Sequence, residues 1–95
     1  MADEIIRREY RFFGWVQGVG FRYRARYAAQ LCELTGWVEN LPDGSVLLQA
    51  QGRPDQLDRL VPLILAKSSW IHIEDMRVRP LPLAEREYGF SVRGW

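Results

Sequence analysis

The chain of 95 residues is long enough for one hydrophobic core that needs neither metal nor disulfide support. Hydrophobic residues make up 47% of it and aromatic residues 13%, which excludes an intrinsically disordered chain. The formal net charge of +1 gives little support to general nucleic-acid binding, which needs a concentrated basic surface. We therefore expect a single globular domain over residues 1–95.

The amino-acid sequence shows neither a targeting signal nor a motif of metal-ligating residues. No secretory signal, transmembrane run or lipidation motif is visible, so we expect a cytoplasmic protein without a membrane partner. Cys32 is the single cysteine, and its place in a helical pattern predicts a small buried hydrophobe. His72 is the single histidine and is interpreted as a structural or exposed residue. One Cys and one His without ligand spacing predict no metal site.

A strand and a helix are predicted first along the chain. Residues 6–13 alternate, which indicates a strand with Tyr10 and Phe12 on its buried face. A helix-like run follows from residue 23 to residue 34, and Gly36 suits its C-terminal end. The apolar positions at helical spacing are Phe21, Ala25, Ala28, Ala29 and Cys32.

A hairpin and a second helix come next. Residues 35–41 and 45–51 are rich in β-formers, and the Pro42-Asp43-Gly44 sequence between them is typical of a tight turn. Pro54 suits the first position of a helix. Its apolar stripe comprises Leu57, Leu60, Val61, Ile64 and Leu65. Pro62 lies inside that stripe, and we expect it to kink or weaken the helix.

The remaining residues predict two further strands. Ile71 to Val78 reads as a strand with a bulge at Glu74-Asp75, where the apolar phase slips by one residue. Residues 80–87 are predicted to be a loop, and residues 90–93 a last strand. The order β-α-β-β-α-β with one extra strand predicts an α+β, ferredoxin-like split β-α-β sandwich. Its two helices would pack on one face of a mainly antiparallel sheet of four to five strands.

The stretch from Gly14 to Arg22 is the first functional signal. Three glycines between a strand and a helix allow positive φ angles, and successive N–H groups at a helix N-terminus can form an anion nest. Arg22 adds a planar fork of donors suited to a phosphate or carboxylate. The stretch alone leaves open a plain Gly-rich connection with a solvated arginine. It matches neither of the two familiar phosphate-loop spacings.

A second stretch, Gly36-Trp37-Val38-Glu39-Asn40 with Asp43-Gly44-Ser45-Val46 just after it, changes that balance. Together the two stretches closely resemble the acylphosphatase family, and the resemblance covers essentially the whole chain. It implies hydrolysis of a carboxylic–phosphoric anhydride to a carboxylate and inorganic phosphate, without metal or cofactor.

The resemblance also implies roles for single residues. Arg22 would bind the phosphoryl group, and Asn40 would position the attacking water. Backbone amides of the intervening loop would hold the same phosphoryl group, and these belong to Trp15, Val16, Gln17, Gly18, Val19 and Gly20. The Gln17 side chain is expected to order the loop through local hydrogen bonds. Inorganic phosphate and sulfate should compete with substrate, and a monomer is expected.

Two positions differ from the family pattern. Trp15 stands where a basic or polar residue is common, and Ser68-Ser69 replaces the usual turn after the second helix. Neither touches Arg22 or Asn40, so they bear on rate, substrate reach and stability.

Two other functions stay open. A non-catalytic ferredoxin-like module could bind single-stranded RNA or a protein, with Phe13 and Trp15 beside Arg7, Arg11 and Arg24. Asn40 would then be a plain hairpin residue. The other possibility is an accessory domain like the acylphosphatase-like segment of hydrogenase-maturation carbamoyltransferases, a role that would need further domains.

Overall fold

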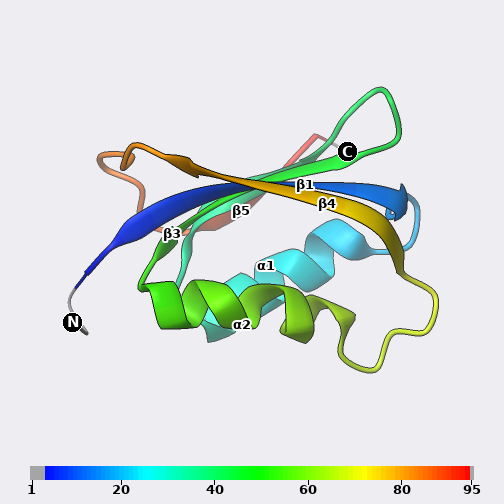
Figure 1. Ribbon diagram of the computed structural model, residues 1–95, viewed down its shortest axis with the longest axis horizontal. Coiled ribbons are helices and arrows are strands. Elements are labelled where there is room, and N and C mark those ends of the chain that lie inside the picture. The colour runs from blue at the N-terminus through cyan, green and yellow to red at the C-terminus, as the bar shows by residue number, and fades with distance from the viewer. Residues whose placement is uncertain (1–3, 95) are drawn as a thin grey trace.

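Two helices lie side by side against one face of a five-stranded sheet, and no helix of residues 4–94 covers the other face (Figure 1). The computed structural model describes residues 4–94. Its elements in chain order are β1 (Ile6–Trp15), α1 (Phe21–Leu31), β2 (Thr35–Asn40), β3 (Val46–Gly52), α2 (Pro54–Leu65), β4 (His72–Leu81) and β5 (Phe90–Arg93).

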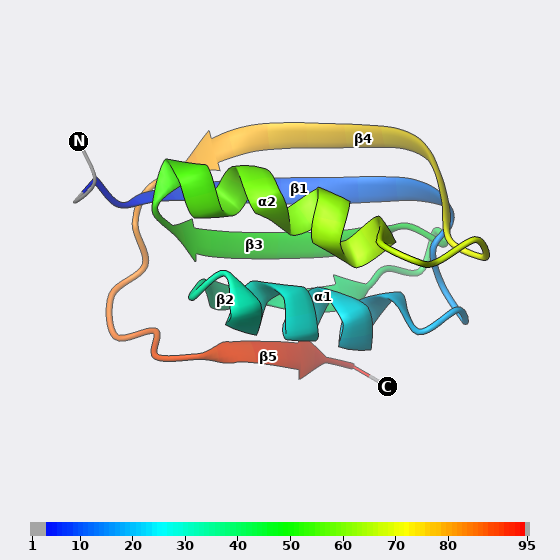
Figure 2. The same cartoon turned by 90° about the horizontal axis from the view of Figure 1, so that it is seen from below.

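The strand order across the sheet is β4-β1-β3-β2-β5. All neighbouring strands are antiparallel except β2 and β5, which run parallel. Seen from the helix side, α2 lies in front of β1 and β3, while α1 lies in front of β2 and β5 (Figure 2). This confirms the predicted α+β sandwich, with β5 as the extra strand.

The core lies between the sheet and the helices. Tyr10 and Phe12 of β1 point into it, as their alternation predicts, and Phe12 is fully buried. The ring of Phe12 lies 4.9 Å from that of Phe21, centroid to centroid, which fastens the start of α1 under the sheet. Burying a side chain of this size stabilises the fold by about 1.5–3 kcal/mol. The predicted buried face of α1 is confirmed, and so is the burial of Cys32 just after it.

The open face of the sheet carries paired charges. Arg7 is 4% exposed and donates to both Glu87 carboxylate oxygens and to Gln49. Burial, the largest single influence, acts to raise the pKa of Glu87, but the hydrogen bonds from Arg7 and Thr35 and the charges of Arg7 and Arg93 together outweigh it, so the pKa is lowered overall. Arg79 likewise donates to Glu9 at 2.7 Å. The basic side chains of this face are therefore largely neutralised by neighbouring acids.

Strand limits differ from the predictions at both ends of the β1–β4 pair. β1 continues to Trp15, because Trp15 pairs with His72 across the ladder. β4 continues through Pro80 to Leu81, residues that were predicted to be loop. Because β4 is an edge strand, a proline there need not cost a ladder hydrogen bond, as it would in a central strand.

The predicted bulge in β4 is confirmed. Phe13 pairs with Asp75 and Gly14 with Ile73, so Glu74 is the extra residue of β4. Gly14 opposite the bulge has a φ of 127°, and a Cβ there would lie 2.4 Å from the His72 carbonyl oxygen. The close approach of the two backbones explains the glycine.

The end of α1 was predicted wrongly. The helix stops at Leu31, not at residue 34, and Glu33 takes the left-handed conformation, with a φ of 57°. Gly36 does not end the helix but lies in β2, where a Cβ would lie 1.9 Å from the Gln49 carbonyl oxygen. Backbone contact across the β2–β3 pair therefore requires this glycine.

Pro62 does not end α2, which continues to Leu65. The side chain of Pro62 is exposed, so the Asp58 carbonyl that its missing N–H leaves free is on the solvent side, where water can bind it. The predicted stripe of this helix is confirmed, with Leu57, Leu60 and Ile64 buried and Val61 and Leu65 packed at its edge.

Candidate active site

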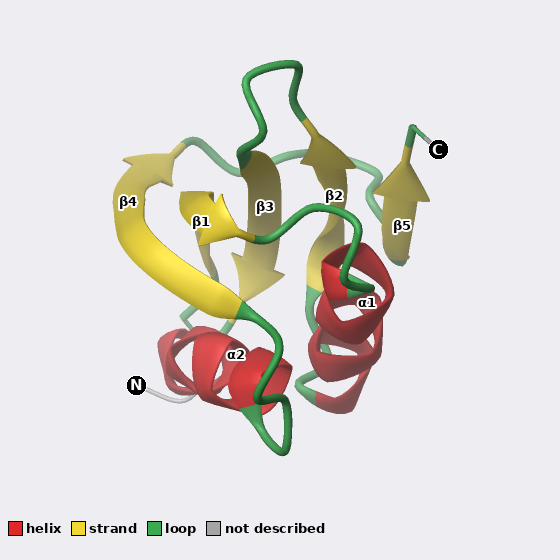
Figure 3. Cartoon of the chain, turned by 90° about the vertical axis from the view of Figure 1, so that its right-hand side faces the viewer, coloured by secondary structure: helices red, strands yellow, loops and turns green. Residues whose placement is uncertain are grey.

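Residues 16–20 form a loop that leads from the end of β1 to the start of α1 (Figure 3). Gly18 and Gly20 have left-handed φ angles of 74° and 78°. A Cβ at either glycine would meet no heavy atom within 4 Å. Backbone conformation, not crowding by the protein, requires these glycines, and the space beside the loop is open to a ligand.

The start of α1 adds unsatisfied donors. Gly20 is the N-cap and offers no side-chain hydrogen bond, and the first turn contains no acidic residue. The N–H groups of this turn have no intrahelical partner, and the helix dipole places partial positive charge at the same end. This end of α1 therefore favours an anion.

A cavity of about 100 Å³ lies between this loop and the end of β2. It is lined by Val16, Gly18, Gly20, Phe21, Arg22, Tyr23 and Asn40. The structure thus brings Arg22 and Asn40 together with three of the six predicted loop residues. Phe21 and Tyr23 were not predicted to line the site.

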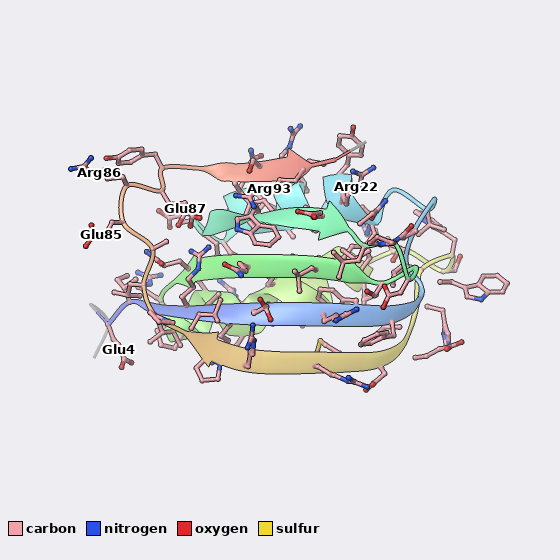
Figure 4. The ribbon with its side chains drawn as sticks, turned by 90° about the horizontal axis from the view of Figure 1, so that it is seen from above. Glu4, Arg22, Glu85, Arg86, Glu87 and Arg93 are labelled. Atoms are coloured by element: carbon pink, nitrogen blue, oxygen red, sulfur yellow. The ribbon has the colours of Figure 1, made fainter. Side chains whose placement is uncertain are left out.

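Arg22 is held in place by the last strand. Its Nη1 donates to the carbonyl oxygen of Arg93, the last residue of β5, at 2.8 Å, and the Arg22 side chain lies near the C-terminal end of that strand (Figure 4). No acidic side chain among residues 4–94 forms an ion pair with Arg22. The guanidinium charge therefore remains available to an anion in the cavity.

Asn40 is the last residue of β2 and borders the cavity from the opposite side. Its Oδ1 is the only buried side-chain oxygen or nitrogen, within the part of the chain described, that has no hydrogen-bond partner. Leaving such an atom unmet costs about 1–3 kcal/mol. The atom is thus an acceptor without a donor, in a residue that lines the cavity.

Gln17 connects the loop to the β2–β3 hairpin. Its Nε2 donates to the Leu41 carbonyl at 2.7 Å and to the Ser45 carbonyl at 2.8 Å. Gln17 therefore orders the loop, as predicted, but its partners are 24 and 28 residues away in sequence and the predicted local bonds are wrong. The Gln17 side chain reaches the hairpin because the fold places the β2–β3 turn next to the loop of residues 16–20.

Asp43 shapes the hairpin turn. Hydrogen bonds from the Ser45 side chain and backbone, with help from Arg11, lower the pKa of Asp43 to about 2. The Arg11–Asp43 contact is 2.6 Å long. This turn supports both Asn40 and the two carbonyls that Gln17 binds.

Trp15 and Val19 do not line the cavity that Arg22 and Asn40 share. They line a second cavity on the β4 side of the loop, together with Trp70 and His72. His72 is exposed, as predicted. Trp70 donates its indole N–H to the Val19 carbonyl at 3.0 Å, a contact that no local sequence signal indicates.

Within residues 4–94 there is no group of three or more His, Cys, Asp or Glu side chains close enough to share a metal ion. The same range contains no helix long and apolar enough to span a bilayer.

The residues that suggested RNA binding are engaged within the protein. Arg7 and Arg11 are bound to acidic partners, and Arg24 donates to the Ile64 carbonyl at the end of α2. The ring of Phe13 is covered by Arg77, at 4.9 Å from its centroid. Of the five residues named for that alternative, Trp15 alone remains largely exposed, at 72%, so these five do not form a free basic and aromatic strip.

A mainly antiparallel sheet with two helices on one face, and a glycine-rich loop leading into a helix N-terminus at one end, defines an α+β sandwich with an end that favours an anion. The acylphosphatase family model matches residues 8–92. The acylphosphatase of Clostridium perfringens is 38% identical over 88 residues, which cover 93% of this chain and 99% of that one. The crystal structure of acylphosphatase from Bacillus subtilis has a TM-score of 0.85 and 31% identity, covering 94% of this chain and 99% of that one.

The chain belongs to the acylphosphatase family and is a hydrolase of acyl phosphates, which are acid anhydrides. Full-length HypF is also similar, with a TM-score of 0.86 and 27% identity over 96% of this chain. This chain spans only 12% of that protein, so the similarity concerns one segment of it.

Proposed function

We propose that the cavity between the loop and β2 is where the acyl phosphate is hydrolysed, with Arg22 binding the phosphoryl group and Asn40 holding the water. The observation that carries this proposal is the convergence, around one cavity, of an arginine without an acidic partner, uncapped helix N–H groups and an unmet amide oxygen. The first two would bind the anion, and the third would bind the nucleophile.

In this mechanism the water oxygen attacks phosphorus while the bond from phosphorus to the acyl oxygen breaks. The electron pair of that bond goes to the departing carboxylate, and the proton of the water passes to the phosphate or to solvent. A carboxylate is a good leaving group, so the protein mainly positions the reactants and stabilises the charge on the equatorial oxygens. The Arg22 guanidinium and the N–H groups of residues 16–20 are donors suited to that purpose.

Asn40 suits the water because its amide is uncharged. A carboxylate at this position would repel the phosphoryl group, whereas Oδ1 accepts a hydrogen bond from water and leaves a lone pair of that water facing phosphorus. Because Asn40 is fixed at the end of β2, the water would be held before the substrate binds. The cost of ordering the water is then already met in the free enzyme.

We also propose that the reaction needs no divalent ion, because Arg22 and the loop amides supply the positive potential at the phosphoryl oxygens. Phosphate release from acetyl phosphate should be unchanged after dialysis against a strong chelator. If turnover disappears and returns with a divalent ion, this part of the mechanism is wrong.

The roles of Arg22 and Asn40 can be separated by kinetics. Arg22 would touch the phosphoryl group before and during reaction, so Arg22→Ala should both raise KM and lower kcat. Arg22→Lys should not restore activity, because one ammonium cannot replace a two-pronged grip. Arg59→Ala is the matched control, since Arg59 is an exposed arginine of α2 that does not line the cavity.

Asn40 would contact only the water, so Asn40→Ala should lower kcat by on the order of 10²-fold while KM changes little. Asn40→Asp should be no more active than Asn40→Ala, because of its negative charge. Should Asn40→Ala keep most of the wild-type kcat, Asn40 is a hairpin residue and another group holds the water.

Anion binding offers a test that does not depend on turnover. Inorganic phosphate and sulfate should inhibit competitively and should raise the melting temperature, since a ligand that binds only the native state stabilises it. Arg22→Ala should lose both effects, and Asn40→Ala should keep both. Full anion stabilisation of the Arg22 variant would place the anion site elsewhere.

A further inference from the structure

The cavity on the β4 side of the loop has a volume of about 570 Å³ and is not used by the mechanism above. It is lined by Trp15, Val19, Ser69, Trp70, His72 and Glu74. Trp15 is 72% exposed and Trp70 is 50% exposed, so two large aromatic rings face solvent around one hollow. We refer to this hollow as the tryptophan cleft.

The tryptophan cleft shares the loop as a common wall with the cavity that Arg22 and Asn40 line, which we call the phosphoryl cavity. Gly18 and Gly20 line the phosphoryl cavity, and Val19 between them lines the cleft. Trp70 donates its indole N–H to the Val19 carbonyl oxygen at 3.0 Å. When the phosphoryl group of a substrate binds beside Gly18 and Gly20, its acyl group therefore has to extend only past Val19 to reach the two tryptophan rings.

Trp70 is fixed before any ligand binds. The Arg24 guanidinium lies over its ring, 5.5 Å from the centroid, and the same side chain donates to the Ile64 carbonyl at 2.8 Å. Ser68 adds a hydrogen bond from its Oγ to the Leu65 carbonyl at 2.9 Å, which fastens the start of the α2–β4 connection. A ring held in this way loses little conformational freedom when a ligand stacks on it.

The strand order sets the direction in which a substrate would lie. Asn40 ends β2, on one side of the loop, and the tryptophan cleft lies beside β4, on the other. In phosphoryl transfer the attacking and leaving oxygens are roughly in line through phosphorus. With the water held by Asn40 as proposed above, the departing carboxylate would leave on the side of the cleft.

On these grounds, and resting on the proposed function, we propose that the tryptophan cleft binds the acyl part of the substrate and selects flat, apolar acyl groups, aromatic ones above all. Trp15 and Trp70 are the specificity-determining residues, because they supply the apolar surface. Glu74 borders the same cleft, so an acyl group that carries its own negative charge is disfavoured there.

The first test compares benzoyl phosphate with acetyl phosphate, which differ only in the acyl group. The wild type should show a higher kcat/KM for benzoyl phosphate. Trp15→Ala should lower the ratio of the two kcat/KM values by about threefold to tenfold, the usual range for one aromatic contact. Tyr88→Ala removes an exposed aromatic ring from the β4–β5 connection and should leave the ratio as it is.

A second test uses inhibitors that cannot be hydrolysed. The matched set is 2-phenylethylphosphonate, ethylphosphonate and 2-carboxyethylphosphonate. The phenyl compound should bind more tightly than the ethyl compound, and Trp70→Leu should reduce that difference. Glu74→Gln should improve binding of the carboxyethyl compound alone, by about twofold to threefold at low salt.

These outcomes separate the two proposals. If neither acyl phosphate is hydrolysed in an Arg22-dependent way, the proposed function fails. If both are hydrolysed with dependence on Arg22, but the benzoyl-to-acetyl ratio and the phosphonate preference are unchanged in both tryptophan variants, the acyl-group assignment of the cleft is overturned and the proposed function stands.

Discussion

Gln17 makes the hydrogen bonds that join the anion loop to the hairpin, and Gln17→Leu removes them at nearly constant volume. The Leu41 carbonyl also accepts from the Gly44 N–H, and the Ser45 carbonyl also accepts from the Leu41 N–H. Each acceptor therefore keeps one donor in the variant. The relevant cost is the net value of a hydrogen bond, about 0.5–1.5 kcal/mol, and not the larger penalty of a buried unmet group.

Two such bonds give an expected loss of about 2 kcal/mol in the free energy of unfolding. For a domain of this size, that corresponds to a drop of about 8–16 °C in melting temperature. The loop should also lose its register against Asn40, so kcat/KM should fall even at temperatures where the variant is fully folded. Both are measurable, by far-ultraviolet circular dichroism on heating and by phosphate release from acetyl phosphate.

Gln30→Leu is the control, because Gln30 is an exposed glutamine of α1 whose side chain has no hydrogen bond within the described residues. Gln30→Leu should change neither the melting temperature nor kcat/KM appreciably. A Gln17→Leu variant that melts within about 2 °C of the wild type and keeps its activity would show that the loop is held by its own backbone, and the reasoning would fail.

Four further predictions concern stability. Hydrogen bonds lower the pKa of Asp43 from 3.8 to about 2. The contribution of Asp43 to the free energy of unfolding is therefore complete above pH 3.8 and is lost as the pH falls towards 2. In an acid titration of stability, Asp43→Asn should show a shallower decline than the wild type over that interval. Gly36→Ala should cost at least about 2 kcal/mol, measured by urea unfolding, because a Cβ would lie 1.9 Å from a carbonyl oxygen of β3. Gly44→Ala, with a positive φ but open space, should cost about 1–2 kcal/mol. Arg7→Met should cost about 3–5 kcal/mol at neutral pH, because the half-buried Glu87 carboxylate loses its partner; a loss below about 1 kcal/mol would mean that water replaces Arg7 there.

Periodicity and turn chemistry predicted most of the fold. The alternation around Tyr10 and Phe12, the apolar stripe of α2 and the Pro42-Asp43-Gly44 turn are local signals, and each element formed where its signal lay. The errors arose where the tertiary structure decided the outcome. Pro80 belongs to a strand because β1 provides a partner for β4, and Gly36 serves a backbone contact with β3 that no local pattern reveals.

The candidate site likewise contains residues that the sequence predicted and contacts that it did not. Arg22, Asn40 and the glycines could be named from two short stretches that resemble a family, and they surround one cavity in the fold. The residues that hold them could not be named. Gln17 reaches a turn 24 residues away, and Arg22 is bound by a carbonyl 71 residues away. Such contacts follow from strand order, which two sequence motifs do not contain.

If Arg22 binds the phosphoryl group as proposed, its hydrogen bond to the Arg93 carbonyl makes catalytic competence depend on a short edge strand of the sheet. β5 has four residues, lies at the sheet edge and pairs with β2 alone. Edge segments of this kind open by local unfolding, at a lower free energy than the whole domain. Each such opening releases the arginine while the core of helices and central strands stays intact. As mild denaturant is added, the rate of hydrolysis should therefore fall before the helix content does. This fall should follow the rise in amide hydrogen exchange of the β5 residues.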